Sequence, residues 1–167
     1  MQVLSPSGGK EAEPSSRLLI VDDDAHFRAT LRQQLAVEGF NDFFEVGVVA
    51  DLDKMLSHAN PDLILLDIQM PDGNSIDICQ RLRRNGFAKP IVMLTTKGAE
   101  GDIVLGLEAG ANDYIIKPLR LSELIARIRT QLRQFRASDD AQFEIGNLRF
   151  VPANKMLHET GSDRMQA

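Results

Sequence analysis

Residues 61–73 read "PDLILLDIQMPDG", in which four consecutive apolar residues are followed by a carboxylate, Asp67, and then by Pro71. A short unbroken apolar run is typical of a strand that is buried on both faces of a parallel sheet. Asp67 is poorly placed to cap a helix, because the residues after it do not begin one and Pro71 favours extended geometry at the residue before it. The stretch therefore predicts a buried strand that ends on a carboxylate with no local role.

The rest of the chain alternates similar strand patterns with helical patterns. Four further β-type runs lie at 17–22, 42–49, 90–95 and 113–118. Helical patterns separate or follow these runs, at 25–38, 51–59, 74–85, 99–109 and from 121 onward. Parallel neighbours need such crossover connections, so the alternation predicts an α/β fold. We expect a doubly wound, five-stranded parallel sheet with helices on both faces, over residues 17–136.

The first helical pattern has the clearest limits. Phe27, Leu31 and Leu35 are spaced four residues apart, which is typical of one buried helix face. Asp24 stands directly before the pattern, where a carboxylate caps free backbone N–H groups, and Gly39 stands just past its end. We therefore expect a helix that begins after Asp24 and ends before Gly39.

The composition narrows the function classes. The net charge of −5 and the pI near 5.2 disfavour a nucleic-acid-binding surface within these residues, because phosphate backbones bind basic faces. The single cysteine, Cys79, excludes an internal disulfide and a multi-cysteine metal site. Residues 1–16 are rich in Ser, Pro, Gly and charge, which predicts a disordered leader without a signal-peptide core. Since the longest aliphatic runs are only strand-sized, we expect no membrane segment and a cytoplasmic location.

The C-terminal residues have a different pattern. Residues 137–142, "ASDDAQ", predict a short polar linker. Residues 143–167 contain short alternating runs separated by turn signals at 146–147 and 153–154, which predict two or three antiparallel strands. A piece of this size is too small to be stable alone. We interpret it as a partial domain.

Polar side chains gather at the carboxyl ends of the predicted parallel strands, namely Asp22, Asp23, Asp67, Thr95 and Lys117. In a sheet of strand order 2-1-3-4-5 the ligand crevice lies at the switch point between strands 1 and 3. That order brings the three carboxylates together, where they repel one another unless a cation neutralises them. Oxygen ligands from carboxylates, completed by water, suit Mg²⁺.

The same crevice has the character of an anion site around one carboxylate. Lys117 supplies a positive charge and Thr95 a hydroxyl donor beside Asp67. Carboxylates act as nucleophiles toward phosphorus, and the transfer depends mainly on positioning and charge neutralisation. Each residue alone has an ordinary explanation, since Thr95 could simply end a strand and Lys117 could simply be solvated. Their joint placement at strand ends favours a phosphoacceptor site.

Four stretches together resemble the receiver domain of bacterial two-component response regulators: "LLIVDDD" (18–24), "PDLILLDIQMPDG" (61–73), "PIVMLTTKG" (90–98) and "GANDYIIKPL" (110–119). The resemblance covers residues 17–136 and implies a flavodoxin-like fold. It implies that Asp67 is the phosphoacceptor, that a sensor histidine kinase donates the phosphate, and that Asp22, Asp23 and the backbone carbonyl of Gln69 bind Mg²⁺. Such a protein is not an enzyme, apart from weak self-phosphorylation and dephosphorylation chemistry.

The resemblance also implies the switch. Thr95 matches the switch hydroxyl, Lys117 the phosphate-binding lysine, and Tyr114 the aromatic residue that turns inward on activation. The bond between Lys117 and Pro118 is expected to be cis.

The C-terminal end is similar to transcription factors of the OmpR/PhoB type. Tyr114, the helix "LSELIARIRTQLRQF" (121–135) and the strand pair "FEIGNLRF" (143–150) match that subfamily. The resemblance implies that residues 143–167 are a partial β platform of a truncated DNA-binding effector domain, whose winged helix is missing. It implies a homodimer formed through the fourth helix, fifth strand and fifth helix.

The expected dimer face departs from the subfamily pattern. Its residues are Ile103, Asn112, Asp113, Glu123 and Arg127. The subfamily has three charge pairs across the two-fold axis, and only Asp113 with Arg127 is retained. Ile103 replaces a basic residue opposite Glu123, and Asn112 with Gln134 replaces another pair, so a more apolar interface is expected.

Two departures lie near the site itself. Thr96 stands where the family mostly has Ala, Gly or Ser, and its bulk narrows access to Asp67. Ser75 stands where a glycine often precedes the third helix.

Two other functions remain open from the sequence. An aspartate-nucleophile phosphohydrolase also uses a strand-end Asp with Mg²⁺, but it normally has a second acid two residues on, where Gln69 stands here. A receiver-like dimerisation or docking module would work without phosphorylation, and the retained Asp67, Thr95 and Lys117 count against it.

Overall fold

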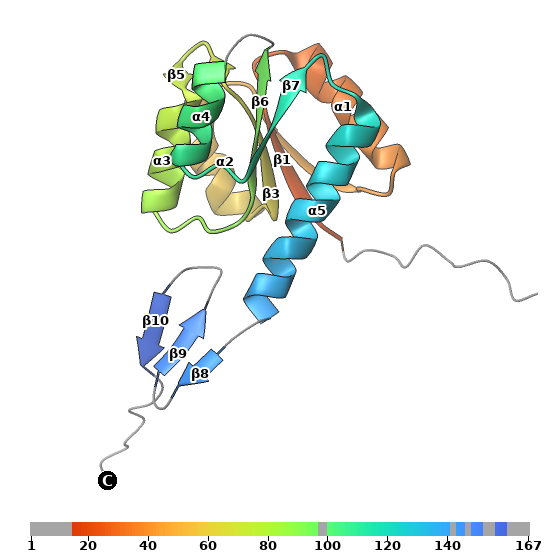
Figure 1. The fold of residues 1–167 in the computed structure, drawn as a ribbon. Helices are drawn as coiled ribbons and strands as arrows, with labels where there is room; N and C mark the ends of the chain where they lie inside the picture. The colour runs from red at the N-terminus through yellow and green to blue at the C-terminus, as the bar shows by residue number, and fades with distance from the viewer. Residues whose placement is uncertain (1–14, 97–99, 141–142, 146–147, 152–155, 160–167) are drawn as a thin grey trace, which may run out of the picture.

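The parallel sheet has the strand order that the sequence predicts. The computed structural model describes residues 15–96, 100–140, 143–145, 148–151 and 156–159. Its main sheet contains β1 (Arg17–Val21), β2 (Asp42–Val46), β3 (Leu63–Asp67), β6 (Ile91–Thr96) and β7 (Asp113–Lys117). All neighbouring strands are parallel, in the order β2-β1-β3-β6-β7. In chain order this is 2-1-3-4-5, so the doubly wound, flavodoxin-like fold is confirmed (Figure 1).

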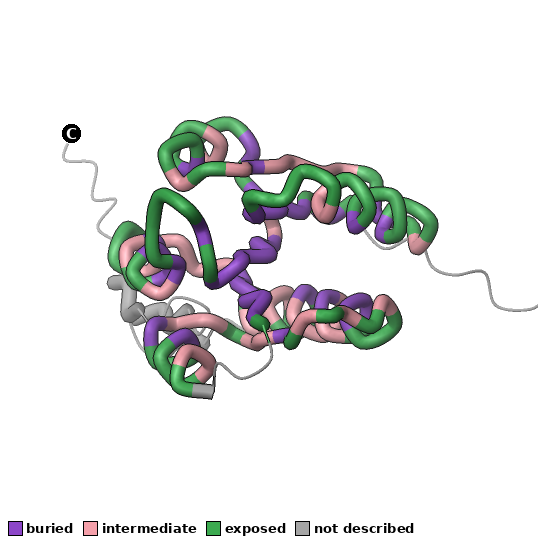
Figure 2. Tube along the Cα trace, turned by 90° about the horizontal axis from the view of Figure 1, so that it is seen from above, coloured by how far each residue is buried: buried purple, intermediate pink, exposed green. Residues whose placement is uncertain are grey.

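Helices cover both faces of this sheet. They are α1 (Ala25–Val37), the short 3-10 helix η1 (Val49–Asp51), α2 (Leu52–Ala59), α3 (Ser75–Arg84), α4 (Glu100–Glu108) and α5 (Leu121–Asp140). Helices α1 and α5 pack on one face, and α2, α3 and α4 lie on the other (Figure 1). Seen from above, buried residues run through the middle of the molecule between the two helical layers (Figure 2).

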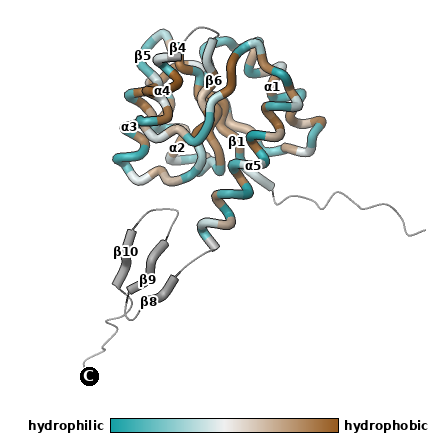
Figure 3. The backbone as a smooth tube through the Cα atoms, in the orientation of Figure 1, coloured by the Kyte–Doolittle hydropathy of each residue, from teal (hydrophilic) through white to brown (hydrophobic). Residues whose placement is uncertain are grey.

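The central strand β3 shows why its apolar run is unbroken. All five of its residues are buried. Leu63 and Leu65 pack in the core beneath α1 and α5, whereas Ile64 and Leu66 pack in the core beneath α2 and α3. Because both faces are covered, neither can be polar. The hydrophobic residues accordingly concentrate in the strands, and hydrophilic residues line the outer sides of the helices (Figure 3).

The limits of α1 are those predicted. The Asp24 carboxylate accepts hydrogen bonds from the amides of His26 at 3.0 Å and Phe27 at 3.1 Å. Gly39 has a φ of 100°, a left-handed conformation that glycine adopts without steric cost. Leu31 and Leu35 are buried and Phe27 is partly buried against them.

The second strand is shorter than its sequence run. It ends at Val46, and residues 49–51 form η1 instead of continuing the strand. The Asp72 carboxylate accepts hydrogen bonds from the amides of Val49 at 2.8 Å and Ala50 at 3.1 Å. This carboxylate satisfies two N–H groups at the start of η1 from a distant loop, which the local sequence does not reveal.

The end of the receiver segment also differs from expectation. Helix α5 continues to Asp140, past residue 136 and into the predicted linker at 137–142. Residues 137–140 contain neither Gly nor Pro, so nothing local stops the helix. At the other end, Ser16 is buried and its hydroxyl accepts a hydrogen bond from Arg136 at 2.7 Å, although the predicted leader included it.

The C-terminal strands are antiparallel, as predicted. They are β8 (Phe143–Ile145), β9 (Leu148–Val151) and β10 (Met156–Glu159), in the order β10-β9-β8. The predicted turns at 146–147 and 153–154 lie outside the described residues, as does the leader over 1–14. A separate two-stranded pair, β4 (Gln69–Met70) with β5 (Gly73–Asn74), follows β3. No helix in the described part of the chain has both the length and the apolar character needed to cross a membrane.

Candidate metal and anion site

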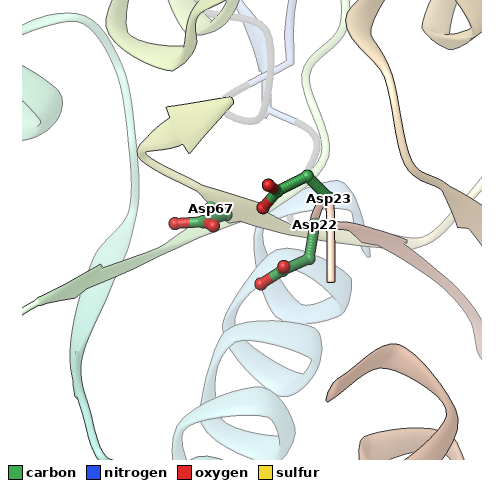
Figure 4. Close-up of side chains that lie close together, drawn as sticks. All are labelled: Asp22, Asp23 and Asp67. Atoms are coloured by element: carbon green, nitrogen blue, oxygen red, sulfur yellow. The ribbon is translucent and has the colours of Figure 1, made fainter. Parts of the chain in front are cut away.

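Three carboxylates meet at the carboxyl end of the sheet. Asp22 and Asp23 directly follow β1, and Asp67 ends the neighbouring strand β3 (Figure 4). One oxygen of each lies within 4.8 Å of the others. Asp22 is 1% exposed and Asp67 is 7% exposed, whereas Asp23 is open to solvent. We call these three residues the acidic cluster, and the strand order brings them together as the sequence predicts.

Lys117 bridges two members of the acidic cluster from the end of β7. Its Nζ lies 2.8 Å from Oδ2 of Asp22 and 3.4 Å from Oδ2 of Asp67. The Phe27 ring faces the same ammonium, with its centroid 4.3 Å from Nζ. Burial by itself lowers the pKa of Lys117, but the hydrogen bond to Asp22 and the charge of Asp67 outweigh it and raise the pKa. Lys117 is therefore cationic and held between the two acids.

The surroundings of Asp67 disfavour the charged form of its carboxyl group. Its pKa is raised, chiefly by burial and further by the negative charge of Asp22, while the charge of Lys117 opposes the shift. Its Oδ1 accepts a 3.3 Å hydrogen bond from the amide of Gln69. The Oδ1 atom of Asp22 accepts a 2.9 Å hydrogen bond from the amide of Asp24. These hydrogen bonds orient the two carboxylates, but main-chain amides do not neutralise their negative charge.

The charge at this site fits a divalent cation. The acidic cluster has three negative charges, and Lys117 supplies one positive charge, which leaves two negative charges uncompensated. Every side-chain ligand in the cluster is an oxygen, and one of the three residues is exposed, so water can complete a coordination shell. Hard cations such as Mg²⁺ and Ca²⁺ take such ligands. The residues present therefore suit a hard divalent metal.

Thr95 and Tyr114 lie on β6 and β7, the two strands that follow β3 in the sheet. Asp67 pairs in register with Leu94, so Thr95 is one residue beyond the partner of Asp67. Thr95 is 2% exposed, and its hydroxyl donates to the carbonyl of Thr96 at 3.4 Å. Tyr114 pairs with a residue two positions before Thr95 and packs, half-buried, against the core beneath α2 and α3. Thr95 therefore lies on the strand next to Asp67, and Tyr114 lies one strand farther, level with Met93.

The predicted dimer-face residues make contacts within their own chain. Arg127 Nη1 lies 2.9 Å from both carboxylate oxygens of Asp113, and Arg127 Nη2 lies 3.1 Å from Glu123. The Asn112 side-chain oxygen accepts hydrogen bonds from Arg83 and from a main-chain amide at the start of β6. Ile103 is half-buried. These charged groups therefore already have partners without a second copy.

Sequence reasoning missed two contacts at the site. Arg28, on α1, donates from Nη1 to the main-chain carbonyl of Asp22 at 2.6 Å. Ser75, at the start of α3, donates its hydroxyl to the main-chain carbonyl of Asp67. Arg28 has no distinguishing sequence signal, whereas Ser75 stood out only as a departure from glycine.

Comparisons with known proteins identify the family of this chain. Residues 18–129 match the family described as the response regulator receiver domain. The DNA-binding response regulator MtrA of Mycolicibacterium smegmatis is 40% identical over 147 residues, which cover 86% of this chain and 62% of MtrA. The response regulator MprA of Mycobacterium avium is 40% identical over 126 residues, which cover 75% of this chain and 55% of MprA. The chain thus spans about three-fifths of the length of these curated relatives.

Solved structures share the fold. A two-component response regulator from Clostridium difficile matches with a TM-score of 0.67 at 28% identity, over 72% of this chain and 98% of that one. A CheY-like receiver domain protein from Methanospirillum hungatei matches with a TM-score of 0.67 at 26% identity, over 72% and 96% of the two chains. The family match runs from β1 into α5 and includes the acidic cluster and Lys117. This chain belongs to the response regulator receiver domain family.

Proposed function

We propose that Asp67 is the phosphoacceptor of this receiver domain and that a histidine kinase is its donor. The observation that supports this most is the position of the Asp67 carboxylate, buried beside two further acids and 3.4 Å from the Lys117 ammonium. In the transfer, a carboxylate oxygen of Asp67 attacks phosphorus and forms an O–P bond. The N–P bond of a phosphohistidine breaks, and the imidazole leaves with the electron pair of that bond. No separate general base is needed, because a carboxylate attacks through an oxygen that has no proton to lose.

When bound, Mg²⁺ would neutralise the negative charge that accompanies this transfer. Asp22, Asp23 and the main-chain carbonyl of Gln69 would hold it together with Asp67. The two negative charges that Lys117 leaves uncompensated support this assignment. Lys117, which lies 3.4 Å from the Asp67 carboxylate, would pair with an oxygen of the phosphoryl group.

The switch follows from the neighbours of Asp67 in the sheet. The buried hydroxyl of Thr95 lies at the end of the adjacent strand, where it can donate to a phosphoryl oxygen. A shift of Thr95 would move β6. Tyr114 would move with it, because it lies on β7, which pairs with β6, and packs against the core beneath α2 and α3. We assign Tyr114 the role of carrying the change to α4 and β7.

The phosphorylated state would then favour a homodimer through α4, β7 and α5. This face exposes apolar side chains that a monomer would leave in water: Val104, Leu105 and Leu107 on α4 and Ile116 on β7. Asp113, Glu123 and Arg127, the charged residues of the proposed face, already pair within the chain. The apolar side chains, more than new charge pairs, would therefore stabilise the dimer.

In a longer protein, the receiver segment would control transcription. The relatives of greater length include MtrA, whose description is a DNA-binding response regulator. Residues 17–136 would form the receiver, and 143–167 the beginning of the β platform of an effector domain. Residues 137–142 would connect them, with 137–140 as the end of α5. DNA contact would come from the winged-helix part, and the protein would act in the cytoplasm.

Phosphorylation by a small donor tests the proposal. With Mg²⁺ and acetyl phosphate, the wild-type protein is expected to gain one phosphate, seen by intact mass spectrometry. Asp67→Asn keeps the shape of the side chain without its nucleophile and should gain none, and chelation of Mg²⁺ should stop the reaction in the wild type. Addition that persists unchanged in Asp67→Asn would refute the assignment. Steady release of inorganic phosphate from a generic ester would instead favour the phosphohydrolase, and wild type that binds no Mg²⁺ would favour the docking module.

A further inference from the structure

Ser75 connects α3 directly to the proposed phosphoacceptor residue. It is the first residue of α3, and its side chain is fully buried. Its hydroxyl donates a hydrogen bond to the main-chain carbonyl of Asp67. A glycine at this position, as the family resemblance favours, has no hydroxyl to offer. The contact is therefore a consequence of this chain's own sequence.

The main-chain carbonyl of Asp67 lies just past the point where β1 can supply hydrogen-bond donors to β3. The registered pairing of β1 with β3 ends one residue before Asp67. On the other edge of β3, the amide of Ile68 donates to the carbonyl of Leu94 at 2.9 Å and holds the main chain on that side. A buried carbonyl without a donor costs about as much free energy as a lost hydrogen bond. The Ser75 hydroxyl completes the anchoring of the main chain at this residue.

The same hydrogen bond closes the segment between β3 and α3. Gln69, whose carbonyl we assign to the metal, lies inside this segment, and its amide donates to the Asp67 carboxylate at 3.3 Å. Farther along, the Asp72 carboxylate ties the segment to the start of η1. The position of the main chain at Asp67 therefore affects both the carboxylate and the Gln69 carbonyl.

We propose that Ser75 is a positioning residue for phosphoryl transfer, whose hydroxyl holds the main chain of Asp67 so that its carboxylate stays within the acidic cluster. This inference rests on the proposed function. A small displacement of a reacting group lowers the rate of a reaction that depends on alignment. If Ser75 only satisfied a buried carbonyl, its removal would lower stability and leave the rate constant of the folded protein unchanged.

Matched serine variants separate these two roles. Ser75→Ala and Ser75→Gly both remove the hydroxyl, and the glycine variant has the residue that the family resemblance favours. Ser57→Ala is the control, because the Ser57 hydroxyl also donates to a main-chain carbonyl, that of Lys54 at 2.8 Å, but on the exposed side of α2. Each protein is incubated with saturating Mg²⁺ and acetyl phosphate, and the phosphorylation rate constant is followed by intact mass spectrometry. Thermal unfolding is recorded on the same samples.

Both Ser75 variants are expected to react about five-fold more slowly than wild type, on the order of one lost hydrogen bond. Ser57→Ala should react at the wild-type rate. A Ser75→Ala protein with a lowered Tm and an unchanged rate would overturn the proposal, as would a slow alanine variant beside a glycine variant of normal rate. Wild type that gains no phosphate, or phosphorylation that persists in Asp67→Asn, would instead refute the proposed function itself.

Discussion

Replacing Lys117 by methionine tests the electrostatics of the site most directly. The ammonium lies 2.8 Å from Asp22, and two unit charges at that distance attract by about 6 kcal/mol at an effective dielectric constant near 20. The desolvation of Asp22, which is 1% exposed, offsets much of this attraction. Since the Lys117 side chain is 22% exposed, we expect Lys117→Met to lower the free energy of unfolding by about 2–3 kcal/mol without metal. Methionine has a similar length and can still pack on the Phe27 ring.

Urea unfolding with and without Mg²⁺ measures this effect. A loss of 2–3 kcal/mol corresponds to a midpoint lower by about 1 M urea. Added Mg²⁺ should stabilise Lys117→Met more than wild type, because the ammonium no longer competes with the metal for two of the carboxylates. The pKa of Lys117 is raised above 10.5, so its stabilising contribution is complete at neutral pH and is lost as the pH rises through that raised pKa. The difference between variant and wild type should therefore shrink at strongly alkaline pH.

Lys89→Met is the matched control. Lys89 pairs with Asp62 at 3.3 Å, with side chains that are 26% and 38% exposed, so its loss should cost only about 0–1 kcal/mol. If Lys117→Met loses no more stability than Lys89→Met, the bridge between Asp22 and Asp67 has no net stabilising effect. If Mg²⁺ stabilises Lys117→Met less than wild type, Lys117 does not compete with the metal.

Two further predictions concern a loop contact and the apolar face. The hydrogen bonds from Val49 and Ala50 lower the pKa of Asp72, so its stabilising contribution is present above its unfolded pKa, near 3.8, and is lost as the pH falls through the lower folded value. Asp72→Ala should thus be less stable than wild type at neutral pH, and urea unfolding should show the gap closing in acid; a gap that is constant with pH would contradict the contact. Leu105 is 51% exposed on α4, and Leu105→Lys should prevent the phosphorylation-dependent dimer in sedimentation velocity while the phosphorylation rate stays normal. Dimerisation of the variant equal to wild type would exclude this face.

The sequence was sufficient for the sheet and for the acidic cluster because both follow from periodic patterns. Strand and helix patterns alternate in a way that only crossover connections satisfy, and this determines a parallel sheet. Once the strands are parallel, residues that end them lie at one edge, so Asp22 and Asp67 could be placed together without coordinates. The cap at Asp24 was equally predictable, since its partners are two and three residues away.

Contacts between distant segments were not predictable in the same way. Asp72 caps η1 from more than twenty residues away and shortens the second strand. Arg127 pairs with Asp113 inside one chain, a contact that their separation of fourteen residues does not reveal, whereas the family resemblance implies a pair across a dimer. Helix α5 extends to Asp140, because a polar composition alone does not end a helix.

The sequence by itself determined the parallel α/β fold and the identity of the acids at the sheet edge, because these depend on local periodicity and on the rule that parallel strands end together. Only the tertiary structure decided how those acids are held. Lys117 reaches Asp22 more closely than Asp67, and Ser75 donates to the Asp67 main chain. Both distances depend on how α3 packs on β3 and on where β7 lies across β6 from β3. Such packing depends on the whole core, so no pattern in the neighbouring sequence predicts it.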